Sequence, residues 1–198
     1  MMRLLHFPVV PVPMEKDGID TKTLENLLQS EQLKWKNESR NPQQQHNMWA
    51  VLYLVPAFHN PTGRLLSVEK SRKIVQLARK YEILVVCDDV YNLLFYEGTK
   101  PPKRLFAYDN RNDSDYSGNV ISNGSFSKIL APGLRLGWME FPKWIKSTFW
   151  DNAVMLDSAG CLNSMCAGIV ASLLERLAVD KFVAELRADY AVTDLTVS

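Results

Sequence analysis

Cysteine and long apolar runs are both scarce in this chain of 198 residues. The 3 cysteines, Cys87, Cys161 and Cys166, are too few and too irregularly spaced for a disulfide framework or a metal-type pair. No run approaches the roughly 18 apolar residues of a membrane span. The opening residues lack a signal-peptide cleavage pattern. We therefore expect a cytoplasmic protein with no metal site and no membrane partner.

An excess of charge of either sign is also absent, because 23 basic residues face 22 acidic ones. A net charge of +1 gives no long-range attraction for nucleic acid, so no nucleic-acid partner is expected. Hydrophobic residues make up 46% of the chain and charged residues 23%, which excludes disordered and fibrous classes. The length suits one large domain, or one domain with a fragment of another.

The most regular part of the sequence reads strand, helix, strand. The apolar run 50–55 predicts a buried strand, and the helical period over 68–81 predicts a helix with Ser67 as its N-cap. The run 83–87 predicts a second strand, which a crossover helix makes parallel to the first.

Further strands are predicted at 119–122 and 136–141. The connection between them is too short for a crossover helix, so the later strand is expected to be antiparallel. The predicted fold is α/β, with three layers (α/β/α) and a mostly parallel sheet that contains one antiparallel strand.

The remaining segments carry weaker signals. Residues 1–13 look like the tail of a strand, 21–28 predicts a short helix, and the polar stretch about 30–48 predicts a surface insertion. Helices are expected over 142–154 and 163–179. The inward face of the second should contain Cys166, Ile169, Val170, Leu173, Leu174 and Leu177.

Polar side chains with complementary chemistry follow three successive predicted strands. Asn60, Asp88 and Lys128 come directly beyond their carboxyl ends, the edge at which open α/β sheets bind ligands. Lysine can form a Schiff base with an aldehyde, and a buried carboxylate needs a cation such as a protonated ring nitrogen. Hydroxyls and a guanidinium that can hold a phosphate are expected at the same edge, from Ser125, Ser127 and Arg135. The pattern indicates a small anionic aromatic ligand with a carbonyl group.

Four motifs at this edge carry a family resemblance. They are Asn60-Pro-Thr-Gly63, Asp88-Asp-Val-Tyr91, Ser125-Phe-Ser-Lys128 and Pro132-Gly-Leu-Arg-Leu-Gly137. In this order the set resembles the signature of the class I/II aminotransferases, the fold type I family that uses pyridoxal 5′-phosphate. Each motif alone is weak, but the ordered set is specific and covers nearly all of the chain.

The resemblance implies residue roles. Lys128 would hold the cofactor as a Schiff base and move protons, and Asp88 would pair with the ring nitrogen. Asn60 and Tyr91 would bind the phenolic oxygen of the ring. Lys128, Asp88 and Tyr91 are thus the catalytic candidates, and the phosphate would be held by Ser125, Ser127 and Arg135.

Each assignment also has a structural alternative. Asp88 can cap a turn, and Lys128 or Arg135 can be solvated surface residues. Roles outside the chemistry are expected for three neighbours: Asp89 as structural or solvent-facing, His59 in turn formation or packing, and Trp138 in the core or an interface.

The loop after the lysine motif points to one branch of the family. Arg135 follows Lys128 by seven residues, one fewer than in many class I members, and this resembles the 2-aminoadipate and broad aromatic aminotransferases and certain bacterial regulators. Family members extend further in both directions. We therefore expect 1–198 to be the central part of the cofactor-binding large domain, without the N-terminal segment and the small C-terminal domain. A polypeptide of these residues alone is expected to aggregate and to lack measurable transamination.

Three functions agree with these motifs. The principal expectation is pyridoxal-phosphate-dependent transamination between an amino acid and a 2-oxo acid, of the 2-aminoadipate, aromatic or broad-specificity type. The family implies a homodimer. The alternatives are a non-catalytic cofactor-binding or regulatory module and another fold type I enzyme, such as a carbon–sulfur lyase. Amino-acid consumption with matching 2-oxo-acid production separates the first from the others.

Overall fold

A computed structural model of the chain describes residues 8–38, 48–95, 102–152 and 163–197. Its centre is a four-stranded sheet in the order β3-β4-β5-β6. The strands are β3 (Val51–Leu54), β4 (Leu84–Asp88), β5 (Val120–Ser125) and β6 (Gly137–Glu140). The pairs β3–β4 and β4–β5 are parallel, whereas β5–β6 is antiparallel. The predicted α/β class and the single antiparallel strand are confirmed.

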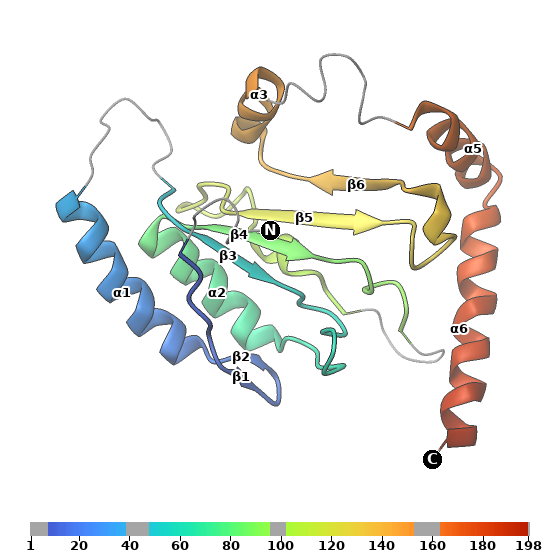
Figure 1. Cartoon of the computed structure of the whole chain (residues 1–198), viewed down its shortest axis with the longest axis horizontal. Coiled ribbons are helices and arrows are strands. Elements are labelled where there is room, and N and C mark those ends of the chain that lie inside the picture. The colour runs from blue at the N-terminus through green and yellow to red at the C-terminus, as the bar shows by residue number, and fades with distance from the viewer. Residues whose placement is uncertain (1–7, 39–47, 96–101, 153–162, 198) are drawn as a thin grey trace.

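Two long helices lie on one side of this sheet (Figure 1). They are α1 (Thr21–Glu38) and α2 (Val68–Tyr81), and a small hairpin of β1 (Met14–Glu15) and β2 (Gly18–Ile19) precedes them. The helix α2 begins as predicted, since the Ser67 hydroxyl accepts a hydrogen bond from the Lys70 amide at 3.3 Å. It ends at Tyr81, where Glu82 adopts the left-handed conformation that closes many helices.

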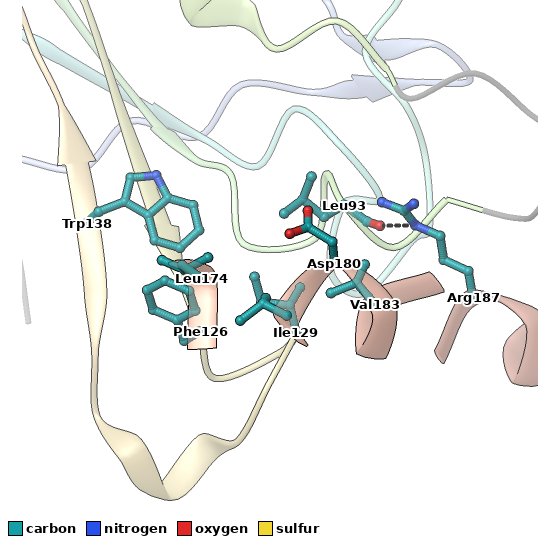
Figure 2. A pocket seen from close by; sticks show the side chains of 9 residues that line it. Leu93, Phe126, Ile129, Trp138, Leu174, Asp180, Val183 and Arg187 are labelled. Carbon is teal, nitrogen blue, oxygen red and sulfur yellow. Dashed lines mark hydrogen bonds between the residues drawn. The ribbon is translucent and has the colours of Figure 1, made fainter. Parts of the chain in front are cut away.

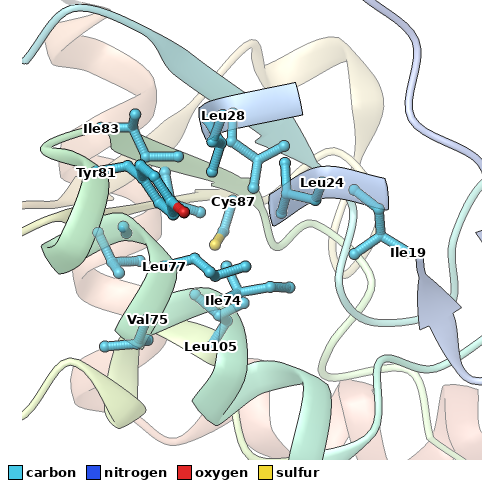
Figure 3. Close-up of a cluster of buried hydrophobic side chains, with 14 residues drawn as sticks. Ile19, Leu24, Leu28, Ile74, Val75, Leu77, Tyr81, Ile83, Cys87 and Leu105 are labelled. Carbon is cyan, nitrogen blue, oxygen red and sulfur yellow. The ribbon is translucent and has the colours of Figure 1, made fainter. Parts of the chain in front are cut away.

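The main core joins these helices to one face of the sheet (Figure 3). Ile74 and Leu77 of α2 and Val85 and Cys87 of β4 are all 1% exposed or less. Burial of this kind is worth about 1.5–3 kcal/mol for each large side chain. The alternating exposure of β4 shows that the other face of the sheet is less covered, with Val86 and Asp88 partly exposed.

The remaining helices follow the sheet in sequence. They are α3 (Lys143–Asn152), α5 (Ser164–Glu175) and α6 (Ala178–Val197), with short 3₁₀ turns η2 (Leu105–Tyr108) and η3 (Pro132–Leu134) before them. The helix α6 stands beyond the end at which β3, β4 and β5 finish (Figure 1). Val179 and Val183 of α6 form a second apolar cluster with Ile129, next to partly buried Phe126 and Trp138.

Several expectations for the less regular segments are wrong. The helix α1 continues to Glu38, so residues 30–38 are not a surface excursion. The Gln, Lys and Glu residues in this stretch are good helix formers, so its polar composition is compatible with a helix. Residues 8–13 contain no strand, and the expectations for 1–7 and 39–47 lie outside the described residues.

The single helix predicted over 163–179 is instead two helices. Leu177 has a left-handed φ of 54°, which breaks the chain between α5 and α6. Val170 is buried, with 2% of its surface exposed. Three other residues that were expected to face inward are more than 40% exposed, namely Ile169, Leu174 and Leu177. The break divides the predicted helix, and within α5 the buried residue is Val170.

Candidate active site at the carboxyl edge of the sheet

The parallel strands β3, β4 and β5 finish at one edge, and the predicted motifs follow them there. Asp88 is the last residue of β4 and lies in register with Asn123 of β5. The loop with Asn60 follows β3, and the turn with Lys128 follows β5. The parallel register therefore brings the motifs to the same edge, as ligand binding in open α/β sheets requires.

Asp88 is held from both neighbouring strands. Its Oδ2 accepts a hydrogen bond of 2.7 Å from the Tyr53 hydroxyl on β3, and its Oδ1 accepts one of 3.2 Å from the Asn123 amide on β5. Partial burial and the adjacent Asp88 charge raise the pKa of Tyr53 to about 12, so this hydroxyl remains a donor at neutral pH. These contacts fix the carboxylate on the less covered face of the sheet.

Asp89 points into the opposite face. It is 2% exposed, and its Oδ2 accepts a hydrogen bond of 2.6 Å from the Ser122 hydroxyl. Arg104 donates to the same hydroxyl at 3.3 Å and pairs with Glu140 of β6. Burial raises the pKa of Asp89. The structural role expected for Asp89 holds, but the expectation of a solvent-facing side chain is wrong.

Lys128 and Tyr91 approach each other from the turns after β5 and β4. The Lys128 Nζ lies 5.9 Å from the centre of the Tyr91 ring, within the range of a cation–π contact. Lys128 is exposed, and Tyr91 is half-buried. A hydrogen bond of 2.9 Å from the Leu94 amide to the Tyr91 carbonyl tightens the turn after β4. A primary amine thus lies beside a phenol at an accessible edge.

The three phosphate candidates flank the end of the β5–β6 hairpin. Ser125 is in register with Gly137, and its hydroxyl accepts a hydrogen bond of 3.1 Å from the Ser127 amide. Arg135 is exposed, has a left-handed φ of 49°, and donates to the Pro132 carbonyl at 3.4 Å. The hairpin therefore places two hydroxyls and a guanidinium near its tip.

The Asn60 loop is a tight turn with an exposed amide. His59 serves the turn, since its Nδ1 lies 2.9 Å from the Thr62 hydroxyl and its carbonyl accepts a hydrogen bond from the Gly63 amide at 2.6 Å. The Asn60–Pro61 peptide bond is cis. These contacts agree with the turn role expected for His59.

A cleft of about 480 Å³ opens beside the 125–129 turn (Figure 2). Apart from Asp180 and Arg187 its lining is apolar, and it includes Leu93, Phe126, Ile129, Trp138, Leu174, Val179 and Val183. The Arg187 Nε donates to the Leu93 carbonyl at 2.7 Å, which ties α6 to the loop after β4. The predicted site residues do not line this cleft, so it is distinct from the candidate site. Trp138 is part of its wall, in line with the expected packing role.

Two further features concern the described residues as a whole. Within these ranges, no group of three or more His, Cys, Asp or Glu side chains is arranged to hold a metal ion. No helix in the described part of the chain is long and apolar enough to cross a membrane.

Sequence reasoning missed the two partners of Asp88. Tyr53 sits on the predicted first strand and Asn123 directly after the predicted third one. Both could have been found by aligning the strands and asking which side chains share a face with Asp88. That step needs the strand register, which the motifs alone do not supply.

Comparison with known proteins identifies the family. The model of the family "Aminotransferase class I and II" matches residues 1–191. The chain belongs to this family, as the four motifs predict.

Relatives found by sequence and by structure include proteins named as aminotransferases. The mitochondrial kynurenine/alpha-aminoadipate aminotransferase of Bos taurus is 38% identical over 136 residues, covering 68% of this chain and 29% of that protein. The uncharacterized HTH-type transcriptional regulator YisV of Bacillus subtilis is 40% identical over 107 residues, covering 54% of this chain and 21% of that protein. The crystal structure of Pyrococcus horikoshii kynurenine aminotransferase has a TM-score of 0.72 and 30% identity, covering 90% of this chain and 39% of that one. The chain thus spans less than two fifths of the length of each of these proteins.

The chemistry at the sheet edge fits pyridoxal phosphate, the cofactor of this family, and the P. horikoshii structure is a complex with PMP. The edge offers an amine in Lys128, a carboxylate in Asp88, and hydroxyls and a guanidinium at the hairpin tip. Each Asp88 oxygen accepts one hydrogen bond from Tyr53 or Asn123, which leaves lone pairs for a ring N–H. The residues present therefore match the aldehyde, ring nitrogen and phosphate of this group.

Proposed function

We propose that the chain forms the cofactor-binding part of a pyridoxal-phosphate-dependent aminotransferase. The reaction exchanges an amino group between an amino acid and a 2-oxo acid. The observation that carries the proposal is the meeting of Asp88, Tyr91 and Lys128 at one sheet edge, beside the hydroxyls of Ser125 and Ser127.

The residues divide the work by their chemistry. When bound, the cofactor withdraws electrons from the carbon atom that carries the amino group. Asp88 holds the ring nitrogen in its protonated, electron-withdrawing form, because an adjacent carboxylate favours the positive charge. Lys128 binds the cofactor and, once released by substrate, moves a proton as general base and acid. Asn60 and Tyr91 bind the ring oxygen.

The phosphate is assigned to the hairpin tip. Ser125 and Ser127 donate hydroxyl hydrogen bonds, and Arg135 supplies a charged planar fork for phosphate oxygens. These groups anchor one end of the cofactor, so that Asp88 and Lys128 meet the ring and the aldehyde in a fixed orientation.

We infer the substrate class from the names of the relatives. We infer an amino-acid donor of the 2-aminoadipate, kynurenine or aromatic type and a 2-oxo-acid acceptor, supported by the name of the bovine relative. We also infer a homodimer in the cytoplasm. The name of the bovine protein carries the word mitochondrial, so fractionation with an epitope tag is the direct test of location.

The site is tested by covalent trapping. The protein as its gene encodes it is incubated with pyridoxal phosphate, reduced with borohydride and mapped by peptide mass spectrometry. Label is expected on Lys128 and lost in Lys128→Ala. Lys103→Ala is the matched control, because the Lys103 amine lies 4.3 Å from the centre of the Tyr108 ring, a similar lysine–tyrosine pair. Label on another lysine, or none, contradicts the assignment.

The reaction is tested by product balance. Transamination consumes a donor such as kynurenine or 2-aminoadipate with 2-oxoglutarate and yields one 2-oxo acid per amino acid consumed. Similarity to the B. subtilis regulator favours one other function, a cofactor-binding regulatory module. Trapping at Lys128 without turnover of any donor would support that function instead.

A further inference from the structure

The carboxylate of Asp88 has donors on both sides, one from each flanking strand. Tyr53 of β3 donates to Oδ2 at 2.7 Å, and Asn123 of β5 donates to Oδ1 at 3.2 Å. The pairings Tyr53–Val86 and Asp88–Asn123 place these side chains on the same face of the sheet. The arrangement follows from the register, because residues of one face alternate along each strand.

Tyr53 is not an ordinary surface tyrosine. It is 52% exposed, close to the 58% of Val51 on the same face of the same strand, so about half of its surface is accessible to solvent. Its hydroxyl nevertheless turns to Asp88 and makes the shorter of the two hydrogen bonds to that carboxylate. Hydrogen bonds to a charged acceptor are stronger than those between neutral groups.

Both donors are neutral, and this matters for the chemistry of the carboxylate. A lysine or arginine in either position would neutralise Asp88 by forming an ion pair. A phenol and an amide orient the carboxylate but leave its negative charge available to a protonated ring nitrogen. The pair therefore fixes the direction of Asp88 without removing the property that the ring requires.

We propose that Tyr53, together with Asn123, is a positioning residue that orients the Asp88 carboxylate toward the ring nitrogen of the cofactor. This inference rests on the proposed function. Tyr53 itself does not touch the reacting atoms and acts through Asp88. Burial and the Asp88 charge also raise the pKa of Tyr53 to about 12, which keeps the phenol protonated and donating over the working pH range.

The first arm of the test needs no cofactor. Tyrosine labelled with carbon-13 at the ring carbon that bears the hydroxyl is followed by NMR as the pH rises, with Tyr53→Phe used to assign the signal. Tyr53 should remain protonated near pH ~11, where an ordinary tyrosine of pKa about 10 is mostly ionised. Asp88→Asn should move the Tyr53 titration to lower pH. An unchanged titration in Asp88→Asn would overturn the hydrogen bond.

The second arm measures how the cofactor responds. Tyr53→Phe should weaken pyridoxal phosphate binding by about tenfold, the effect of one lost hydrogen bond to a charged group. It should also shift the pH at which the absorption band of the bound cofactor changes, while borohydride still labels Lys128. Tyr108→Phe is the control, because Tyr108 belongs to η2 and its ring contacts Lys103.

The outcomes separate the two proposals. If the unaltered protein does not bind pyridoxal phosphate, the proposed function fails. If it binds, and Tyr53→Phe matches Tyr108→Phe in affinity and in the pH response of the absorption band, the positioning role fails while the proposed function stands. A changed pH response with Lys128 still labelled supports the role, because a merely structural tyrosine would not move that response.

Discussion

Asn119 joins three elements at the end of the parallel strands opposite the candidate site, and its removal has a calculable cost. The residue is fully buried, and its Nδ2 donates to the carbonyls of Ala78 at 3.1 Å and Ile83 at 3.0 Å. Its Oδ1 accepts a hydrogen bond of 2.6 Å from the Ser117 hydroxyl. These contacts tie the end of α2 and the start of β4 to the start of β5, the strand that leads to Lys128.

The cost of Asn119→Ala is the sum of lost contacts and unpaired groups. The Ala78 carbonyl keeps a hydrogen bond of 3.1 Å from the Ile83 amide, so it retains a partner. The lost Ser117 hydrogen bond is worth about 1 kcal/mol, and the buried Ile83 carbonyl left without its side-chain donor costs about 1–3 kcal/mol. We expect a loss of about 3 kcal/mol in the free energy of unfolding, a large part of the total for an ordinary domain.

Urea unfolding followed by far-ultraviolet circular dichroism measures this loss in the protein as its gene encodes it. Asn110→Ala is the control, since Asn110 is exposed and its side chain accepts one local hydrogen bond from the Asn112 amide. The control should change the free energy of unfolding by less than about 0.5 kcal/mol. A loss below about 1 kcal/mol in Asn119→Ala, with an unchanged urea dependence, would refute the reasoning.

Two further predictions concern the paired acids. Asp88→Asn should leave pyridoxal phosphate bound through the hairpin tip, yet lower kcat by about a hundredfold to a few thousandfold. Losing a buried charge partner costs about 3–5 kcal/mol, and about 1.4 kcal/mol is a tenfold rate effect. Near-normal kcat would show that this carboxylate does not tune the ring. For Asp89, burial raises the folded-state pKa above the ordinary value of 3.8, so the charged form opposes folding and the stability from this group falls as pH rises through that interval. Asp89→Asn keeps an acceptor for Ser122 and should therefore gain in relative stability from acid to neutral pH, as thermal unfolding across this range will show; a difference independent of pH would count against a charged, buried Asp89.

The sequence predicted the β3–α2–β4 unit because its local signals agree with its packing. Ile74, Val75, Ala78 and Tyr81 of the predicted apolar face of α2 are buried, although Val68 is 54% exposed, and Ser67 makes the expected cap. The edge that gathers Asp88 and Lys128 follows from parallel strands alone. Residue types and strand ends were therefore sufficient to predict the edge at which these residues gather.

The features that the sequence did not predict depend on tertiary contacts between segments that are distant in the chain. The extension of α1 to Glu38 is accompanied by stacking of Trp35 on Trp49, with ring centres 6.2 Å apart, a contact between distant segments. The partners of Asp88 depend on strand register, which needs every neighbouring strand to be placed first. The break at Leu177 depends on how α5 and α6 pack, and the helical period carries no signal for it.

The adjacent carboxylates of Asp88 and Asp89 lie on opposite faces of the sheet because successive side chains of a strand point to opposite faces. Asp88 meets Tyr53 and Asn123 on one face, whereas Asp89 is sealed against Ser122 on the other. A shift of one residue in the pairing of β4 would exchange them, giving the ligand face the wrong acid and burying the right one. Composition and motif would be unchanged by such a shift. A single inserted or deleted residue in the apolar run of β4 would therefore alter the candidate site, even though none of the aliphatic side chains of this strand takes part in the proposed chemistry.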